Sequence, residues 1–297
     1  MQLRWNDPRL LVASDDARRA RYRALQSWWR ETVLGLEPGL DGEIPRANLL
    51  PEGNRALNFL DPRIAAYAAS RAQEVLGGGG TLDPNRLERN LLSSMPLCFN
   101  VFGLLRAEPE TAARVLATLF DLPIHTIEAI EVEWAPAEHP LLDRTAFDAF
   151  VAYRTEDGRR GFVGVETKYT EPFSQTEYES DAYESWTATP VSGFRPGAAA
   201  HLVRRATNQL WRNALLAVAV RADERFDLGH VAVLGTADDT GAATAVAGLR
   251  QWHERPDELL RAATLEALVR LAKEEPPLAS WASAFERRYL DLAPIGR

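Results

Sequence analysis

Two acidic residues and one lysine near the middle of the chain form the pattern with the clearest potential for chemistry. Asp148 lies in an aromatic and aliphatic run, residues 147–153, while Glu166 and Lys168 lie two positions apart in a second such run, residues 162–170. Burying charged groups among Phe, Val and Gly is costly unless they pair with each other or bind a cation. These three residues are therefore the first candidates for a functional site.

The two runs are predicted to form a β-hairpin. An Asp-Gly pair at positions 157–158 lies between them, and such a pair is a strong signal for a tight turn between strands. Antiparallel pairing about this turn puts Asp148 opposite Glu166 or one residue away. Because side chains alternate along a strand, Glu166 and Lys168 share one face.

Two alternatives bear on this cluster. Asp143 is an alternative to Asp148 as the acid that faces Glu166. Hairpin register would place Asp143 near residues 171–172, beyond the end of the strand. A structural salt bridge of Lys168 with Glu166 or Asp148 is the interpretation without a catalytic role. Only two of the 34 basic residues are lysines, which hints that a compact ammonium, and not a planar guanidinium, is needed at position 168.

Composition is that of an ordinary soluble protein. The chain has 297 residues, 46% hydrophobic and 26% charged, which suffices for one large domain or a domain with an extension. The net charge of -8 requires any nucleic-acid binding to use a local basic surface. The single cysteine, Cys98, excludes an intramolecular disulfide and a cysteine-rich zinc site. No apolar run reaches membrane-spanning length and the N-terminus lacks a signal peptide's apolar region, so we expect a cytoplasmic protein without membrane contact.

Hydrophobic periodicity predicts helices, then strands, then further helices. Helices are expected at residues 14–33, 62–75, 83–105 with a break near Pro96, 110–120, 198–220, 242–253, 267–271 and 278–290. Strands are expected at residues 127–134, 147–153, 162–170, 227–236 and 259–265. Residues 171–196, polar and aromatic, are interpreted as a long loop beside the hairpin.

This order of elements resembles the core of the PD-(D/E)XK nuclease superfamily, the restriction-endonuclease-like fold. The motif would be Asp148 followed by Glu166-Thr167-Lys168 on the adjacent strand, and the surrounding run resembles that of a bacterial restriction-endonuclease group. One departure is that Phe147, not proline, precedes the first acid.

The resemblance covers roughly residues 110–271 and implies an α/β fold. A central mixed sheet of four to five strands would be flanked by helices. Residues 1–85 would form a helical N-terminal extension, and residues 86–297 the nuclease-like domain.

The resemblance also implies roles for individual residues. Asp148 and Glu166 would hold Mg²⁺, with Mn²⁺ as an alternative, and the backbone carbonyl of Thr167 would be a third ligand. The metal would lower the pKa of a bound water and offset transition-state charge. Lys168 would orient the attacking water or stabilise the charged oxygens.

Further candidates lie on helices. Related nucleases often carry Gln, Lys or Arg on the helix after the hairpin, which makes Arg205, Gln209 and Arg212 candidate substrate ligands, with a solvated helix face as the alternative. Glu88 is a candidate for an additional acid from an early helix, against the alternative of a surface glutamate.

The functional expectation is a metal-dependent nuclease hydrolysing phosphodiester bonds in DNA, of a restriction, defence or repair type. It would act as a homodimer or with a partner subunit. The alternative is a catalytically inactive nuclease-fold module that binds nucleic acid or a partner protein. The acidic balance and the lack of a DNA-reading motif favour that alternative or dependence on partner subunits.

Overall fold

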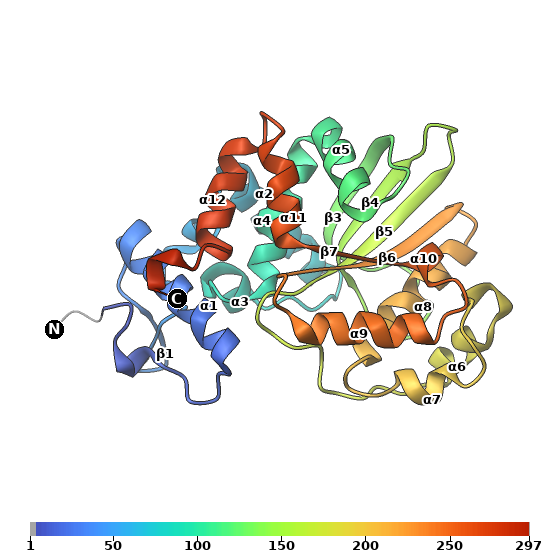
Figure 1. Cartoon of the computed structure of the whole chain (residues 1–297), viewed down its shortest axis with the longest axis horizontal. Coiled ribbons are helices and arrows are strands. Elements are labelled where there is room, and N and C mark those ends of the chain that lie inside the picture. Colours follow the sequence, from blue (N-terminus) through green and yellow to red (C-terminus); the bar gives the residue numbers. More distant parts are fainter. Residues whose placement is uncertain (1–3, 297) are drawn as a thin grey trace. The chain divides into compact units, whose positions relative to one another are not determined.

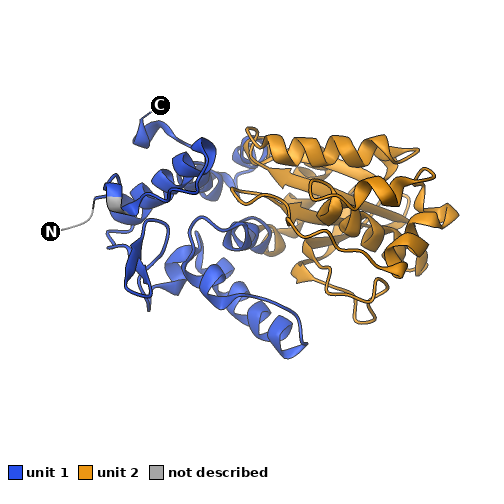
Figure 2. Cartoon of the chain, turned by 90° about the horizontal axis from the view of Figure 1, so that it is seen from below, with its two compact units in different colours: residues 1–104, 269–297 blue, residues 105–268 orange. Residues whose placement is uncertain are grey.

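The computed structural model describes residues 4–296, so the first three residues of the N-terminal stretch considered above lie outside it. The chain divides into two compact units, residues 1–104 with 269–297 (unit 1) and residues 105–268 (unit 2), coloured separately in Figure 2. In the described part of the chain, no helix has the length and apolar character needed to cross a membrane.

Unit 1 is mostly helical. Its elements are α1 (Ala17–Trp28) continued by a π-helical turn (Trp29–Val33), a short hairpin of β1 (Gly39–Asp41) and β2 (Ile44–Arg46), a 3-10 turn (Arg55–Asn58), α2 (Pro62–Gly77), α3 (Pro84–Arg89), most of α4 (Ser94–Ala107) and α12 (Ala279–Tyr289). The predicted helical segment 83–105 breaks at residues 90–93 and not near Pro96. Pro96 lies in the first turn of α4, where a proline removes no helical hydrogen bond.

The last helix, α12, packs with helices from the first part of the chain in unit 1. Asn100 on α4 donates a hydrogen bond to the Tyr289 hydroxyl on α12 at 2.9 Å, and the Trp281 indole donates to the Asn100 carbonyl at 2.9 Å. Gln26 on α1 donates to the Arg288 carbonyl at 2.7 Å. These buried bonds explain why unit 1 draws on both ends of the chain. The expected domain division at residue 85 stays a prediction.

Unit 2 is built on a five-stranded sheet (Figure 1). The strands are β3 (Thr126–Trp134), β4 (Phe147–Arg154), β5 (Arg160–Thr167), β6 (Leu228–Gly235) and β7 (Leu260–Thr264), and they lie side by side in this order. The pairs β3–β4 and β4–β5 are antiparallel, whereas β5–β6 and β6–β7 are parallel. The predicted α/β architecture with a mixed central sheet is confirmed.

The β4–β5 hairpin forms as predicted. Gly158 adopts a positive φ of 84°, which the tight turn requires and a glycine adopts without strain. Ala149 pairs with Val165, so the next position along places Asp148 opposite Glu166. Strand β5 ends at Thr167, and Lys168 follows it with its backbone N–H bonded to the Leu234 carbonyl on β6 at 2.8 Å.

Helices cover both faces of this sheet. Figure 1 shows α5 (Pro109–Phe120) and α8 (Asn208–Ala222) on opposite sides of the strands. The face under α8 is aromatic, with the Phe150 and Phe162 rings stacked 5.2 Å apart. Gly164 allows the Phe147 ring to lie on the sheet there, because a Cβ at residue 164 would fall 2.4 Å from that ring.

Two expectations for the region between β5 and β6 are wrong. The predicted loop 171–196 contains a helix, α6 (Asp181–Ala188), begun by the Ser180 side chain as its N-cap. The predicted single helix 198–220 is two, α7 (Ala198–Leu202) and α8.

The break between α7 and α8 has a local cause. Thr207 donates its hydroxyl to the Leu202 carbonyl at 2.9 Å, and Asn208 donates its amide to the Val203 carbonyl at 2.9 Å. Side chains of this kind compete with the helical backbone bonds. Arg205 therefore lies in the break and not on a helix. Beyond β6, α9 (Thr240–Gln251), α10 (Pro256–Leu259) and α11 (Leu265–Lys273) complete the order, and the strand predicted at 259–265 is confirmed as β7.

Candidate active site

Asp148, Glu166 and Lys168 come together at the end of β4 and β5. The Lys168 ammonium lies 2.8 Å from Glu166 Oε1. Glu166 is 2% exposed and Lys168 5% exposed, whereas Asp148 is half-buried. The hairpin brings the two acids together because residues 148 and 166 face each other across it, and Lys168 lies one strand repeat beyond Glu166.

The two carboxylates repel each other. Burial, followed by the charge of Glu166, raises the pKa of the Asp148 carboxyl to about 7, and the Lys168 ammonium opposes this rise. Thr167 also opposes it, since its backbone N–H and hydroxyl donate to Asp148 Oδ2 at 2.7 and 2.9 Å. The excess negative charge at this corner of the sheet is therefore only partly neutralised by the protein itself.

Two amides of α8 hold the Glu166 carboxylate from the side of the helix. Gln209 donates to Glu166 Oε1 at 2.6 Å, and Asn213 donates to Oε2 at 2.7 Å. Gln209 also accepts from the Lys168 ammonium at 3.2 Å. Because residues four apart lie on one face of a helix, Gln209 and Asn213 act on the same carboxylate.

The segment after β5 covers the lysine. The Phe173 ring lies 4.2 Å from the Lys168 ammonium, and the Ser174 N–H donates to Gln209 Oε1 at 2.8 Å. A cavity of about 350 Å³ opens beside these groups. Its lining includes Lys168, Phe173, Arg205 and Asp239.

The residues at this corner fit a divalent cation. Two carboxylates that repel each other are the hard oxygen donors that Mg²⁺ prefers, and a cation would relieve the repulsion. Within residues 4–296, no group of three or more His, Cys, Asp or Glu side chains is placed to hold a metal ion. A cation between Asp148 and Glu166 would thus take its other ligands from backbone carbonyls, water or substrate.

Comparison with protein families shows to which superfamily the chain belongs. A family model for the PD-(D/E)XK nuclease superfamily matches residues 13–291. The chain belongs to this superfamily. The match extends well beyond the sheet of unit 2 and includes the helices of unit 1. No curated protein and no solved structure matches the chain.

Membership confirms the expected restriction-endonuclease-like fold, and the match begins nearer the N-terminus than the region 110–271 on which the resemblance rested. The departure from the superfamily pattern also has a structural setting. Phe147, in the position of the usual proline, stacks with the Trp134 ring on β3 at 5.9 Å and lies over Gly164 on β5. Phe147 therefore packs on both strands next to β4, and these contacts anchor the neighbouring Asp148 at the end of β4.

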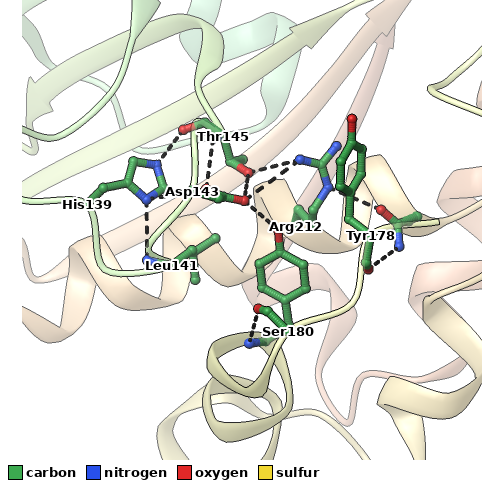
Figure 3. Close-up of polar contacts among 9 residues, drawn as sticks. His139, Leu141, Asp143, Thr145, Tyr178, Ser180 and Arg212 are labelled. Atoms are coloured by element: carbon green, nitrogen blue, oxygen red, sulfur yellow. Dashed lines mark hydrogen bonds and ion pairs between the residues drawn. The ribbon is translucent and has the colours of Figure 1, made fainter. Parts of the chain in front are cut away.

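Arg212 lies near a different carboxylate. Its guanidinium donates to the Thr145 hydroxyl at 3.1 Å and to Asn208 Oδ1 at 3.1 Å, and it lies 3.9 Å from Asp143 (Figure 3). The Tyr178 ring stacks on it, 4.5 Å from the guanidinium carbon to the ring centroid. The two predicted substrate ligands on α8 thus differ in their surroundings. Gln209 contacts the cluster of Asp148, Glu166 and Lys168 (the acid–lysine cluster), whereas Arg212 faces Asp143.

Asp143, the rival for the first acid, is part of a closed structural network. It accepts hydrogen bonds from the Thr145 backbone and hydroxyl at 2.8 and 2.6 Å and from the Tyr183 hydroxyl (Figure 3). Burial alone would raise the pKa of Asp143, but these hydrogen bonds outweigh it and lower the pKa below its usual value. This carboxylate is already stabilised as an anion.

Two other predicted residues have partners that are not members of the cluster. Arg205 is exposed in the break before α8, where its backbone N–H donates to Glu177. Glu88 is on α3 of unit 1, where it pairs with Arg55 at 3.6 Å.

Asn213 and Phe173 contact the cluster, and Ser174 contacts Gln209 beside it, but the sequence analysis did not single out these three residues. The sequence does contain a signal for Asn213, because a residue four positions after Gln209 lies on the same face of a helix.

Proposed function

We propose that this chain is a divalent-metal-dependent nuclease that hydrolyses phosphodiester bonds in DNA. The observation that carries the proposal is the convergence of Asp148 and Glu166 at the ends of β4 and β5, next to the Ala149–Val165 pair, with the Lys168 ammonium 2.8 Å from Glu166. Membership of the nuclease superfamily supports the reaction class. Mg²⁺ is the proposed cofactor and Mn²⁺ the alternative.

Asp148, Glu166 and the backbone carbonyl of Thr167 are the proposed metal ligands. A bound divalent cation supplies a water of lowered pKa and offsets charge on the phosphate. The protein's part is to orient both carboxylates, and the charge of a bound cation would favour the ionised form of Asp148, whose pKa the protein alone raises. Thr167 fixes Asp148 through two hydrogen bonds, while Gln209 and Asn213 fix the plane of the Glu166 carboxylate.

Lys168 is the proposed electrostatic catalyst. Its ammonium is 5% exposed and held by Glu166, Gln209 and the Phe173 ring, so it is oriented before substrate arrives. A fixed positive charge in a water-poor site stabilises developing negative charge on a phosphoryl oxygen or orients the attacking water. A compact ammonium suits this place better than a guanidinium.

Substrate contacts are proposed for Arg205, Gln209 and Arg212. Arg205 lines the cavity beside Lys168 and is exposed, so it is available to a phosphate of the nucleic-acid backbone. Gln209 contacts Lys168, which lines the same cavity. Arg212 is committed to Asp143 and Tyr178, which leaves it a supporting role at the margin of the site. A cytoplasmic setting, with a second copy or a partner subunit, completes the proposal.

The second candidate is a catalytically inactive module of the nuclease fold. One observation favours it: Lys168 and both oxygens of Glu166 are already engaged within the protein. In that reading the cluster is a structural salt bridge, and nucleic acid or a partner protein would bind without being cleaved.

A cleavage assay separates the two candidates. Plasmid, linear duplex and single-stranded DNA, with RNA as a comparison, are incubated with Mg²⁺, Mn²⁺ or a chelator. The nuclease proposal expects metal-dependent cleavage by the wild type and loss of cleavage in Lys168→Ala and Lys168→Arg alike. Full cleavage by Lys168→Arg contradicts the assigned role of the ammonium. Binding without cleavage under every metal condition supports the inactive module.

A further inference from the structure

Tyr178 differs from its aromatic neighbours between β5 and α8. Phe173, Tyr183 and Phe194 are 5%, 3% and 8% exposed and belong to the core of unit 2. Tyr178 is 45% exposed. An aromatic ring left in solvent beside a candidate active site does not serve the core, so its position requires another explanation.

The buried face of the Tyr178 ring rests on an immobilised cation. Figure 3 shows the guanidinium of Arg212 against the Tyr178 ring, and its carbon lies 4.5 Å from the ring centroid. That guanidinium is itself held by Asn208 and Thr145 and lies near Asp143. Because the supporting arginine is fixed, the ring loses little further freedom when something stacks on its other face.

The backbone beside Tyr178 is tied to the first turn of α8 and to the break before it. Asn208 donates to the Tyr178 carbonyl at 2.9 Å, and the Arg205 N–H donates to Glu177 at 3.2 Å. Asn208 is followed by Gln209, which donates to Glu166 in the acid–lysine cluster. The backbone of Tyr178 is therefore tied, through Asn208, to the residue next to one that contacts Glu166.

We propose that Tyr178 stacks on an unpaired nucleobase of the substrate, adjacent to the phosphodiester that is cleaved. This inference rests on the proposed function and names its substrate class, a nucleic acid with a single-stranded segment at the site. Every base has a flat π-face, so stacking on tyrosine needs no particular base. A base inside an intact duplex has both faces covered and cannot use the ring, which makes the contact selective for single strands.

The test compares single-stranded and duplex DNA of one sequence, with 2-aminopurine at successive positions of the single strand. Asp148→Asn serves as the background so that binding is measured without cleavage. Onto it are placed Tyr178→Phe, which keeps the ring, and Tyr178→Leu, which keeps apolar volume without a π-face. Val191→Ala is the control, because Val191 is 54% exposed in the 3-10 turn Pro190–Ser192 and its carbonyl accepts a hydrogen bond from Arg221 in the last turn of α8. Melting temperature reports folding in each variant.

Tyr178→Phe and the control are expected to bind single strands like the background protein. Tyr178→Leu is expected to bind them about tenfold more weakly, with duplex affinity unchanged. In the background protein, 2-aminopurine fluorescence should be quenched at one position, and Tyr178→Leu should abolish that quenching.

Equal affinity of Tyr178→Leu and Tyr178→Phe for single strands would overturn the inference. Equal losses of affinity for single strands and for duplex in Tyr178→Leu would also overturn it. So would unchanged nucleic-acid binding in that variant together with loss of a complex with a partner protein. The proposed function fails separately: if the wild type never cleaves but Tyr178→Leu still weakens single-strand binding, the ring contact stands and the inactive module replaces the nuclease.

Discussion

Two carboxylate clusters lie beside α8, and they are stabilised in opposite ways. Asp143 accepts hydrogen bonds from Thr145 and Tyr183, with Arg212 nearby, and its pKa is lowered. Asp148 faces Glu166, and burial together with that charge raises its pKa. Both clusters contain a cation from the chain, Arg212 in one and Lys168 in the other.

The difference supports the place proposed for a divalent cation. At Asp143 one carboxylate meets several donors and a nearby guanidinium, so the anion is fully supported. At Asp148 and Glu166 two carboxylates share one ammonium, and a net negative charge remains at the end of the hairpin. Sites of uncompensated charge in a cleft are where function is expected, whereas satisfied networks serve stability.

The largest expected contrast is in cleavage. Asp148→Asn and Glu166→Gln each keep the shape of the side chain but remove charge from a hard-cation site, so metal-dependent cleavage should fall by at least about a hundredfold. Asp143→Asn should cleave within a few-fold of the wild type. The measurement is cleavage rate against Mg²⁺ concentration. Wild-type rates in Glu166→Gln would refute the metal-ligand assignment.

Asparagines five residues apart on α8 provide the next contrast. Asn213→Ala removes a donor to Glu166 and should weaken Mn²⁺ binding by about 10–100-fold, as is typical for partners of metal ligands. Asn208→Ala removes contacts to Arg212 and Tyr178 and should leave Mn²⁺ affinity unchanged. Calorimetric titration of the two variants makes the comparison. Equal effects would show that α8 acts only as a scaffold.

The two aspartates should also differ in their effect on folding. Asp143→Asn disrupts a network in which the anion accepts several hydrogen bonds, so the free energy of unfolding should fall by about 1–3 kcal/mol. Asp148→Asn relieves repulsion, so stability without metal should hold or rise. Chemical denaturation in the presence of a chelator measures both. A strong loss of stability in Asp148→Asn would support the structural salt-bridge interpretation.

The smallest contrast is in pH dependence. The pKa of Asp148 is raised from 3.8 to about 7, so the stability it contributes in the metal-free protein is present below pH 3.8 and is lost as pH rises through 7. Asp143 has a lowered pKa, so its contribution is present above pH 3.8 and is lost as pH falls. Melting curves of Asp148→Asn in chelator should lack the decline between pH 4 and 7. A decline identical to that of the wild type would exclude Asp148 as its source.

The sequence predicted the hairpin that brings Asp148 and Glu166 together because its signals are local. The Asp-Gly turn sets the register, and the aromatic and β-branched runs on either side define the strands. The mixed sheet was implied by the resemblance of the element order to the nuclease superfamily. The hairpin signals depend on neighbours in sequence, which is why the amino-acid sequence alone predicts them.

The features that were not predicted depend on competition or on distant contacts. The helix 198–220 keeps its periodicity through the break, and side-chain bonds from Thr207 and Asn208 interrupt it. Arg212 was predicted as a substrate ligand on the helix after the hairpin, but its partner Asp143 lies 69 residues earlier, before β4. The last helix, α12, packs in unit 1 through contacts such as that of Gln26 with Arg288. No local sequence pattern predicts such a contact.

The most direct test of the central claim is calorimetric titration of Mn²⁺ into three proteins at pH 8, where Asp148 is ionised. The account predicts one bound ion for the wild type and for Asp143→Asn, and no measurable binding for Asp148→Asn. Binding by Asp148→Asn with wild-type affinity, or loss of binding in Asp143→Asn alone, would contradict the assignment of the cation site to Asp148 and Glu166.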